Sequence, residues 1–419
     1  MNFNRKPTND FSQFIKEYYT RVGMRCPKLK AIAGKWTFED LIPGLSDFDT
    51  RLIFADGITI DEWIEMSLSV GCVHTELAKE FPHWARILEH LPGINLTYSE
   101  MTDEKFYYPE FQQWSFYHGD ETIIGRIKSY LSAKEWNERD ELFHLKKFSV
   151  YYGRYIRGID PAINLGKWEN KYPLHSRFMH YFTPPVQSAV SIIENKGIAG
   201  KFESLRKAKE IFPESDVIDM IFDAVDKHYE IEEYYQEPKL TEIEDKLERY
   251  LQNVLGELKK YVTLTNIQGT EEPIELKKKV RSISIDAIEQ FFEGSRFCRF
   301  MKGRLLFYAE SINWFDSSWL IRNELGRIIT NFYEKPLRSF GLIRFGEKLS
   351  ADEVLERIDD VIDAEIRKNI KEFVRIASRP IANGSEKKRA KEVADVFEAV
   401  QIMIELLSKE IRKMEPKNG

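Results

Sequence analysis

Two aspartates, Asp47 and Asp49, have the residue type and spacing best suited to chemistry in this sequence. They open an apolar segment that runs to Phe54, is rich in β-branched and aromatic residues, and follows a Pro-Gly pair, which together predict a strand entered through a turn. Alternate side chains of a strand share a face, so the two carboxylates and Arg51 project together at intervals of about 6 to 7 Å. Carboxylate oxygens at that spacing are suited to hard divalent cations. The pattern predicts a Mg²⁺ or Mn²⁺ site that can clamp a triphosphate; the alternative is an Asp-x-Asp in a surface turn, at a solvated edge.

The elements that must position this pair lie close to it in the chain. The short apolar run from Leu29 to Ala33 predicts a buried strand, which stops at Gly34, where the backbone can come close to a ligand. Apolar residues at helical spacing predict a helix from Phe11 to Val22, before that strand. After the aspartates, the segment from Gly93 to Glu100 predicts a further strand.

This layout resembles a known family motif. Ala33-Gly34-Lys35, eleven further residues and then Asp47-Phe48-Asp49 are similar to the motif of the nucleotidyltransferase superfamily of the DNA polymerase β type, and Ser46 has the common place before the first aspartate. The superfamily includes the aminoglycoside nucleotidyltransferases, a small-molecule branch that the chain resembles, and the tRNA CCA-adding enzymes. The resemblance covers about Leu29 to Tyr98. It departs at Lys35, where the family usually has Ser or Gly.

The resemblance implies an α+β protein whose N-terminal nucleotidyltransferase-type domain contains a mixed sheet, followed by mostly α-helical domains. It implies that Asp47 and Asp49 hold Mg²⁺ with a third carboxylate on a later strand, for which Glu100 is the candidate and Asp103 and Asp120 are rivals. The implied reaction moves a nucleoside monophosphate from an NTP, with ATP expected, to a hydroxyl acceptor. The residues expected to contact the triphosphate are Gly34, Lys35, Ser46 and Arg51.

The segment from Tyr151 to Gln187 is irregular, because glycines and prolines interrupt it and basic residues alternate with tyrosines. Such a segment is suited to hold phosphates and to stack a base or sugar. We expect four of its cations to line the same cleft as Asp47, namely Arg154, Arg157, Lys171 and Arg177. The alternative is an ordered loop whose arginines pair with local carboxylates.

Length and composition set the remaining expectations. The 419 residues, 42% apolar and 31% charged, suggest two or three domains, and we place them at residues 1–145, 146–265 and 275–419. The three cysteines lack Cys-x-x-Cys spacing, and the sequence has neither a signal peptide nor a run of membrane-spanning length, so we expect a cytoplasmic protein. The net charge of −6 favours a small-molecule acceptor over a nucleic acid and leaves a protein acceptor open. The alternative is a catalytically inactive binding or regulatory protein of the same fold. Lys35 supports this alternative, because it replaces the small residue that the family usually has there.

Overall fold

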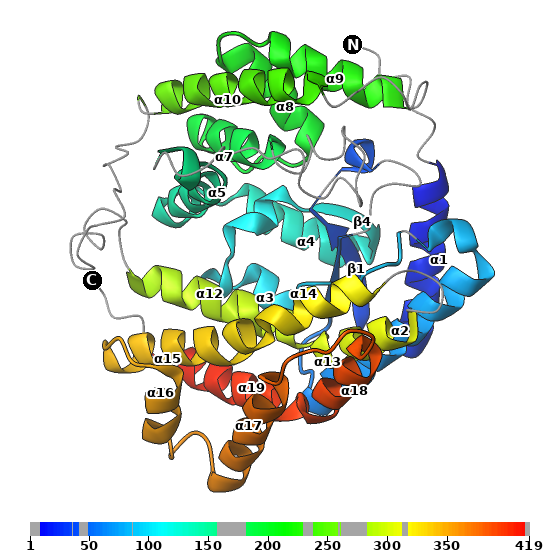
Figure 1. The fold of residues 1–419 in the computed structure, drawn as a ribbon, viewed down its shortest axis with the longest axis vertical. Helices are drawn as coiled ribbons and strands as arrows, with labels where there is room; N and C mark the ends of the chain where they lie inside the picture. Colours follow the sequence, from blue (N-terminus) through cyan, green and yellow to red (C-terminus); the bar gives the residue numbers. More distant parts are fainter. Residues whose placement is uncertain are drawn as a thin grey trace.

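The computed structural model describes residues 9–35, 37–41, 49–85, 87–156, 182–228, 238–258, 260, 283–311 and 317–414. A small sheet lies near the N-terminus, and helices form the rest of the described chain (Figure 1). This confirms the α+β class. The elements up to β4 are α1 (Asn9–Arg25), β1 (Leu29–Gly34), the 3₁₀ helix η1 (Phe38–Asp40), β2 (Thr50–Phe54), α2 (Ile60–Glu80), η2 (Pro82–Trp84), β3 (Asn95–Thr97), α3 (Tyr98–Thr102), η3 (Glu104–Phe106), η4 (Pro109–Gln113) and β4 (Ser115–Gly119).

Helices make up the remainder of the described structure. The elements that follow the sheet are α4 (Glu121–Ser132), α5 (Glu138–Ile156), α7 (Thr183–Glu194), α8 (Lys201–Ile211), α9 (Asp216–His228), α10 (Pro238–Leu258), α12 (Ile283–Cys298), α13 (Met301–Ser311), α14 (Ser318–Ile329), the π-helical turn η5 (Thr330–Glu334), α15 (Lys335–Phe345), α16 (Ala351–Arg357), α17 (Ala364–Ala377), α18 (Glu386–Val396) and α19 (Glu398–Lys413). Among the described helices, none combines the length and the apolar character needed to cross a membrane.

The sheet is mixed, with the strand order β3-β2-β1-β4. Strand β1 is antiparallel to both β2 and β4, whereas β2 is parallel to β3. Side chains alternate between two apolar clusters, as strand geometry requires. Ile32, Leu52 and Phe54 belong to the larger cluster, on one face, while Ala33 and Ile53 belong to a smaller cluster on the other. The sheet is therefore covered on both faces, and even Arg51 in the middle of β2 is buried.

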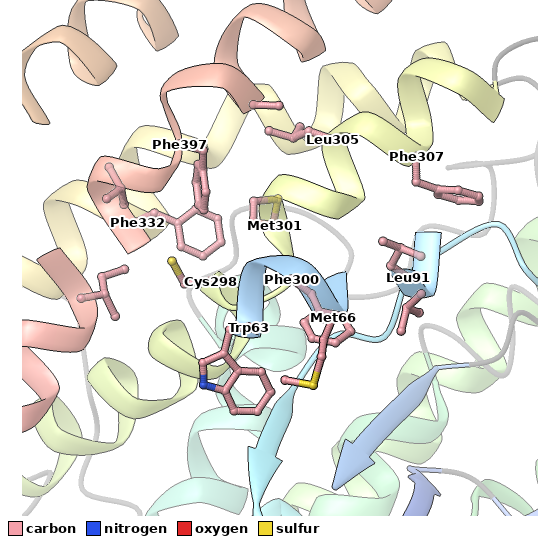
Figure 2. Close-up of a cluster of buried hydrophobic side chains, with 14 of the residues drawn as sticks. Trp63, Met66, Leu91, Cys298, Phe300, Met301, Leu305, Phe307, Phe332 and Phe397 are labelled. Atoms are coloured by element: carbon pink, nitrogen blue, oxygen red, sulfur yellow. The ribbon is translucent and has the colours of Figure 1, made fainter. Parts of the chain in front are cut away.

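The larger cluster joins the beginning of the chain to its end. Helix α2 packs against α13, and Figure 2 shows Trp63 and Met66 of α2 together with Met301 and Leu305 of α13. Helices α7 to α10 enclose a separate apolar cluster. The division of the chain into three domains stays a prediction; the structure adds that the first and third of the expected segments share one hydrophobic core.

Local sequence signals account for several element boundaries. The side chain of Thr59 accepts a hydrogen bond from the backbone N–H of Glu62, and the carboxylate of Glu62 accepts one from the N–H of Thr59, so α2 begins with a capping box. The predicted strand from Gly93 to Glu100 is wrong beyond Thr97. There a second capping box, between Thr97 and Glu100, starts helix α3.

Candidate functional site

The antiparallel register of β1 and β2 brings Lys35 and Asp49 together. Gly34 pairs with Thr50 and Ala33 pairs with Arg51, so the next pair outward in the same register is Lys35 with Asp49. Ala33 lies on the face of the sheet that carries the smaller apolar cluster, and strand alternation gives Arg51, Lys35 and Asp49 that same face. Three charged side chains thus meet where β1 ends and β2 begins.

Arg51 forms the buried floor of this site. Its Nη1 lies 3.6 Å from Oδ1 of Asp49, and its Nη2 lies 3.4 Å from Oε1 of Glu110 on η4. The same Glu110 oxygen accepts a hydrogen bond from the indole N–H of Trp114, at 3.2 Å. Because Arg51 and Glu110 are almost fully buried, whereas half of the Asp49 side chain is exposed, the floor is fixed and one carboxylate stays open to solvent.

Two lysines form the rim. The Nζ atom of Lys147, on α5, lies 3.4 Å from Oε2 of Glu110. Burial, followed by the positive charge of Lys147, lowers the pKa of Lys35 to about 7, although Glu110 and Asp49 oppose this shift. Burial by itself would raise the pKa of Glu110, but the charges of Lys147, Lys35 and Arg51 lower it instead. Lys35, Asp49, Arg51, Glu110 and Lys147 are called the charged cluster below.

The described residues of the charged cluster do not make a metal centre. The guanidinium of Arg51 lies between the carboxylates of Asp49 and Glu110, where a divalent cation would have to bind both. Within the described ranges, no group of three or more His, Cys, Asp or Glu side chains is arranged to hold a metal ion. Asp47, the first expected ligand, lies outside the described residues.

Glu100, the candidate third carboxylate, does not lie on a strand as expected. It lies on α3 and not on a strand, and its two oxygens form a bidentate pair with Arg299, at 2.7 Å each. Arg412 of α19 adds a contact of 2.8 Å, and the backbone N–H of Thr97 adds one of 2.9 Å. Burial would raise the pKa of Glu100, but these arginines lower it. Glu100 therefore ties α3 to the C-terminal helices, and we do not retain it as a metal ligand.

Gly34 is explained by packing. A Cβ atom at this position would come within 2.5 Å of the ring of Tyr117 on β4. Strand alternation directs that Cβ to the face opposite the charged cluster. The glycine therefore allows the Tyr117 ring to cover β1, and a contact between Gly34 and a phosphate stays a prediction.

The structure does not describe the side chains of the remaining expected site residues, so their roles stay predictions. Ser46 and Asp47 lie outside the described residues, as do Arg157, Lys171 and Arg177. The backbone of Arg154 belongs to α5, but its side chain is outside the described part. The proposed cleft of basic residues beside Asp47 stays a prediction.

A cavity of about 630 Å³ lies next to the charged cluster, between α12 and the segment from α14 to α15. Its wall includes Phe297, and the ring of Phe297 would be 3.1 Å from a Cβ at Gly93, where Nη1 of Arg51 would be 3.5 Å away. Glu293 also lines the cavity, and its carboxyl group interacts electrostatically with Glu110 and Lys147. Phe297 and Glu293 thus connect the cavity with the charged cluster.

Sequence reasoning missed Glu110 and Lys147, which are 61 and 98 residues beyond Asp49. Neither stands in a motif, and only the tertiary fold brings them to Arg51.

No protein-family model matches the chain, and neither the curated proteins nor the solved structures contain a match.

Proposed function

We propose that the chain is a nucleotidyltransferase that binds an NTP, with ATP expected, at the charged cluster. The single observation that carries this proposal is the convergence of Lys35, Arg51 and Lys147 at the open end of β1 and β2. Lys35 and Lys147 are partly exposed above the buried Arg51. Three cations beside the two carboxylates of Asp49 and Glu110 leave an excess of positive charge suited to a polyphosphate. The order of helix α1, strand β1, short helix η1 and strand β2 supports the same proposal, because the resemblance to the nucleotidyltransferase superfamily rests on that layout.

In the proposed reaction, the acceptor hydroxyl oxygen forms a bond to the α-phosphorus of the NTP. The bond from that phosphorus to the oxygen bridging to the β-phosphate breaks, pyrophosphate leaves with the electron pair, and the hydroxyl proton passes to solvent. Lys35 and Lys147 neutralise the phosphate chain, and the fixed guanidinium of Arg51 orients it. We route no step through a resident metal, because the described residues do not fit one. The NTP enters as its magnesium complex, the form in which Mg²⁺ is commonly held by substrate phosphates.

Release of pyrophosphate from each of the four NTPs with Mg²⁺, measured with a panel of hydroxyl compounds, tests the proposal. Asp49→Asn should abolish release, because the half-exposed Asp49 carboxylate is the group of the charged cluster that can contact the Mg²⁺ of the incoming magnesium–NTP complex. It should change stability by less than about 1 kcal/mol, since Asp49 is half exposed and Arg51 keeps Glu110. Asp395→Asn, at an exposed position of α18, is the matched control. Full activity of Asp49→Asn would refute the assignment.

One observation favours the alternative of a catalytically inactive nucleotide-binding or regulatory protein. The family places its third carboxylate on a later strand, but β3, the parallel neighbour of β2, carries only Asn95, Leu96 and Thr97. This reading predicts that an NTP raises the melting temperature without any pyrophosphate release. Saturation at about 100 times Kd would add about 2.7 kcal/mol to the free energy of unfolding.

A further inference from the structure

The cavity beside the charged cluster has the size of a small-molecule site. Its volume of about 630 Å³ lies within the usual range of about 300 to 1,000 Å³ for ligand pockets. Phe297, Met301 and Phe332 provide apolar wall, while the polar groups Gln290, Glu293 and Asn331 also line it. An apolar wall with a few polar groups is the usual composition of a site for a small organic ligand.

Positive charge predominates on one side of this cavity. Arg304 and Arg327 share a single carboxylate, that of Glu324, at 3.4 and 3.1 Å. Lys335 adds a third cation to the wall, and the remaining acidic group is Glu293. Burial, followed by the negative charge of Glu110, raises the pKa of Glu293, which favours its neutral form. Three cations therefore line the cavity together with two carboxyl groups, those of Glu293 and Glu324.

Arg327, Asn331 and Lys335 are spaced four residues apart along α14, the π-helical turn η5 and α15, and all three line the cavity. Helical neighbours at this spacing have Cβ atoms about 5 to 6 Å apart, so their side chains can converge on one group. π-Helical turns occur frequently at functional sites. Arg327 and Lys335 are both exposed, so their charged ends are accessible to a ligand.

We propose that this cavity binds the acceptor, and that the acceptor is a small phosphomonoester of a polyhydroxyl compound. Its phosphate is held by Arg327, Asn331 and Lys335, and a hydroxyl group is directed past Glu293 towards the charged cluster. A phosphate offers up to two negative charges and three acceptor oxygens, which match a guanidinium, an amide and an ammonium group. The assignment of this ligand as the acceptor rests on the proposed nucleotidyl transfer.

Calorimetric titration of the full chain with glycerol 3-phosphate tests the site, with glycerol and inorganic phosphate as comparison ligands. We expect glycerol 3-phosphate to bind more tightly than either comparison ligand. Lys335→Gln and Arg327→Gln should each raise its Kd about tenfold, the loss of one charge-assisted contact. Lys388→Gln and Arg375→Gln, at exposed positions on α18 and α17, are the matched controls and should leave the Kd unchanged. Absence of binding, or equal Kd values in cavity variants and controls, would overturn the proposal.

ATP binding to the same variants separates this inference from the proposed function. Lys335→Gln should leave the Kd for ATP unchanged, because Lys335 is not part of the charged cluster. If ATP binds and glycerol 3-phosphate does not, the cavity assignment fails alone. A third outcome is that only the cavity variants bind glycerol 3-phosphate more weakly, while the wild-type chain does not bind ATP. In that case the cavity is a phosphomonoester site, but its role as an acceptor site is refuted together with nucleotidyl transfer.

Discussion

Lys35 gives the sharpest test of the charged cluster, because we expect it to take up a proton when the ligand binds. The pKa of about 7 in the unliganded chain means that Lys35 is about 9% protonated at pH 8. A bound triphosphate adds negative charge beside the ammonium and should raise the pKa of Lys35 towards its ordinary value near 10.5. Binding of ATP should therefore take up a proton.

The size of this uptake follows from the two pKa values. If the bound pKa is 10 or higher, Lys35 takes up about 0.9 proton per ATP at pH 8 and only about 0.1 at pH 6, where it is already charged. If the pKa of Lys35 rises by three units, ATP binds the protonated form of Lys35 more favourably than the neutral form by about 4 kcal/mol. The affinity for ATP should accordingly fall by nearly tenfold per pH unit above about pH 8.

Calorimetry in buffers with different ionisation enthalpies measures this proton uptake directly. Lys35→Met should remove it, while Lys388→Met, at an exposed position of α18, should leave it unchanged. Protonation of the phosphate itself, near pH 6, is the same for both variants and cancels in the comparison. Equal uptake by the wild-type chain and Lys35→Met at pH 8 would show that Lys35 does not contact the triphosphate.

Three further substitutions test the structural roles of residues around the site, each by urea unfolding. Gly34→Ala should destabilise the fold by about 1 to 3 kcal/mol because its Cβ would clash with Tyr117, and a smaller loss in a Tyr117→Leu background would confirm the clash. Glu100→Gln should cost about 3 to 5 kcal/mol, since it leaves the buried charge of Arg299 without its bidentate partner; a cost below 1 kcal/mol would contradict the clamp. Asp40→Ala should cost about 1 to 3 kcal/mol because Asp40 accepts backbone hydrogen bonds that begin α8; an unchanged unfolding midpoint would refute that role.

The elements with strong local signals could be predicted from the sequence. The helical period from Phe11 and the apolar run from Leu29 each correspond to an element of the structure. These signals depend on neighbours within a few residues of one another, so a single sequence contains them in full. The strand after Asp49 was also predicted correctly, although it begins at Thr50.

The position of Glu100 shows how a local signal was misinterpreted. Alternating apolar residues favoured a strand through Glu100, yet Thr97-Tyr98-Ser99-Glu100 also has the Ser/Thr-x-x-Glu pattern of a capping box. The same pattern begins α2 at Thr59 and α16 at Ser350. The carboxylate was therefore needed to begin a helix, and its charge is compensated by arginines that follow it by about 200 and 310 residues, which no local pattern can indicate.

The resemblance to the nucleotidyltransferase motif departs at Lys35, and the geometry at the end of β1 is consistent with a long side chain there. Gly34 directs its Cβ position towards Tyr117, so the backbone at the end of β1 is already closed on that face. The next residue projects to the opposite face, opposite Asp49 and towards Glu110. A small residue at position 35 would leave the backbone exposed there. Lysine instead places an ammonium group at the rim of the charged cluster, opposite Asp49 on the neighbouring strand. Phosphate binding through a backbone turn is thus replaced, in our proposal, by phosphate binding through a side chain whose charge depends on pH near neutrality.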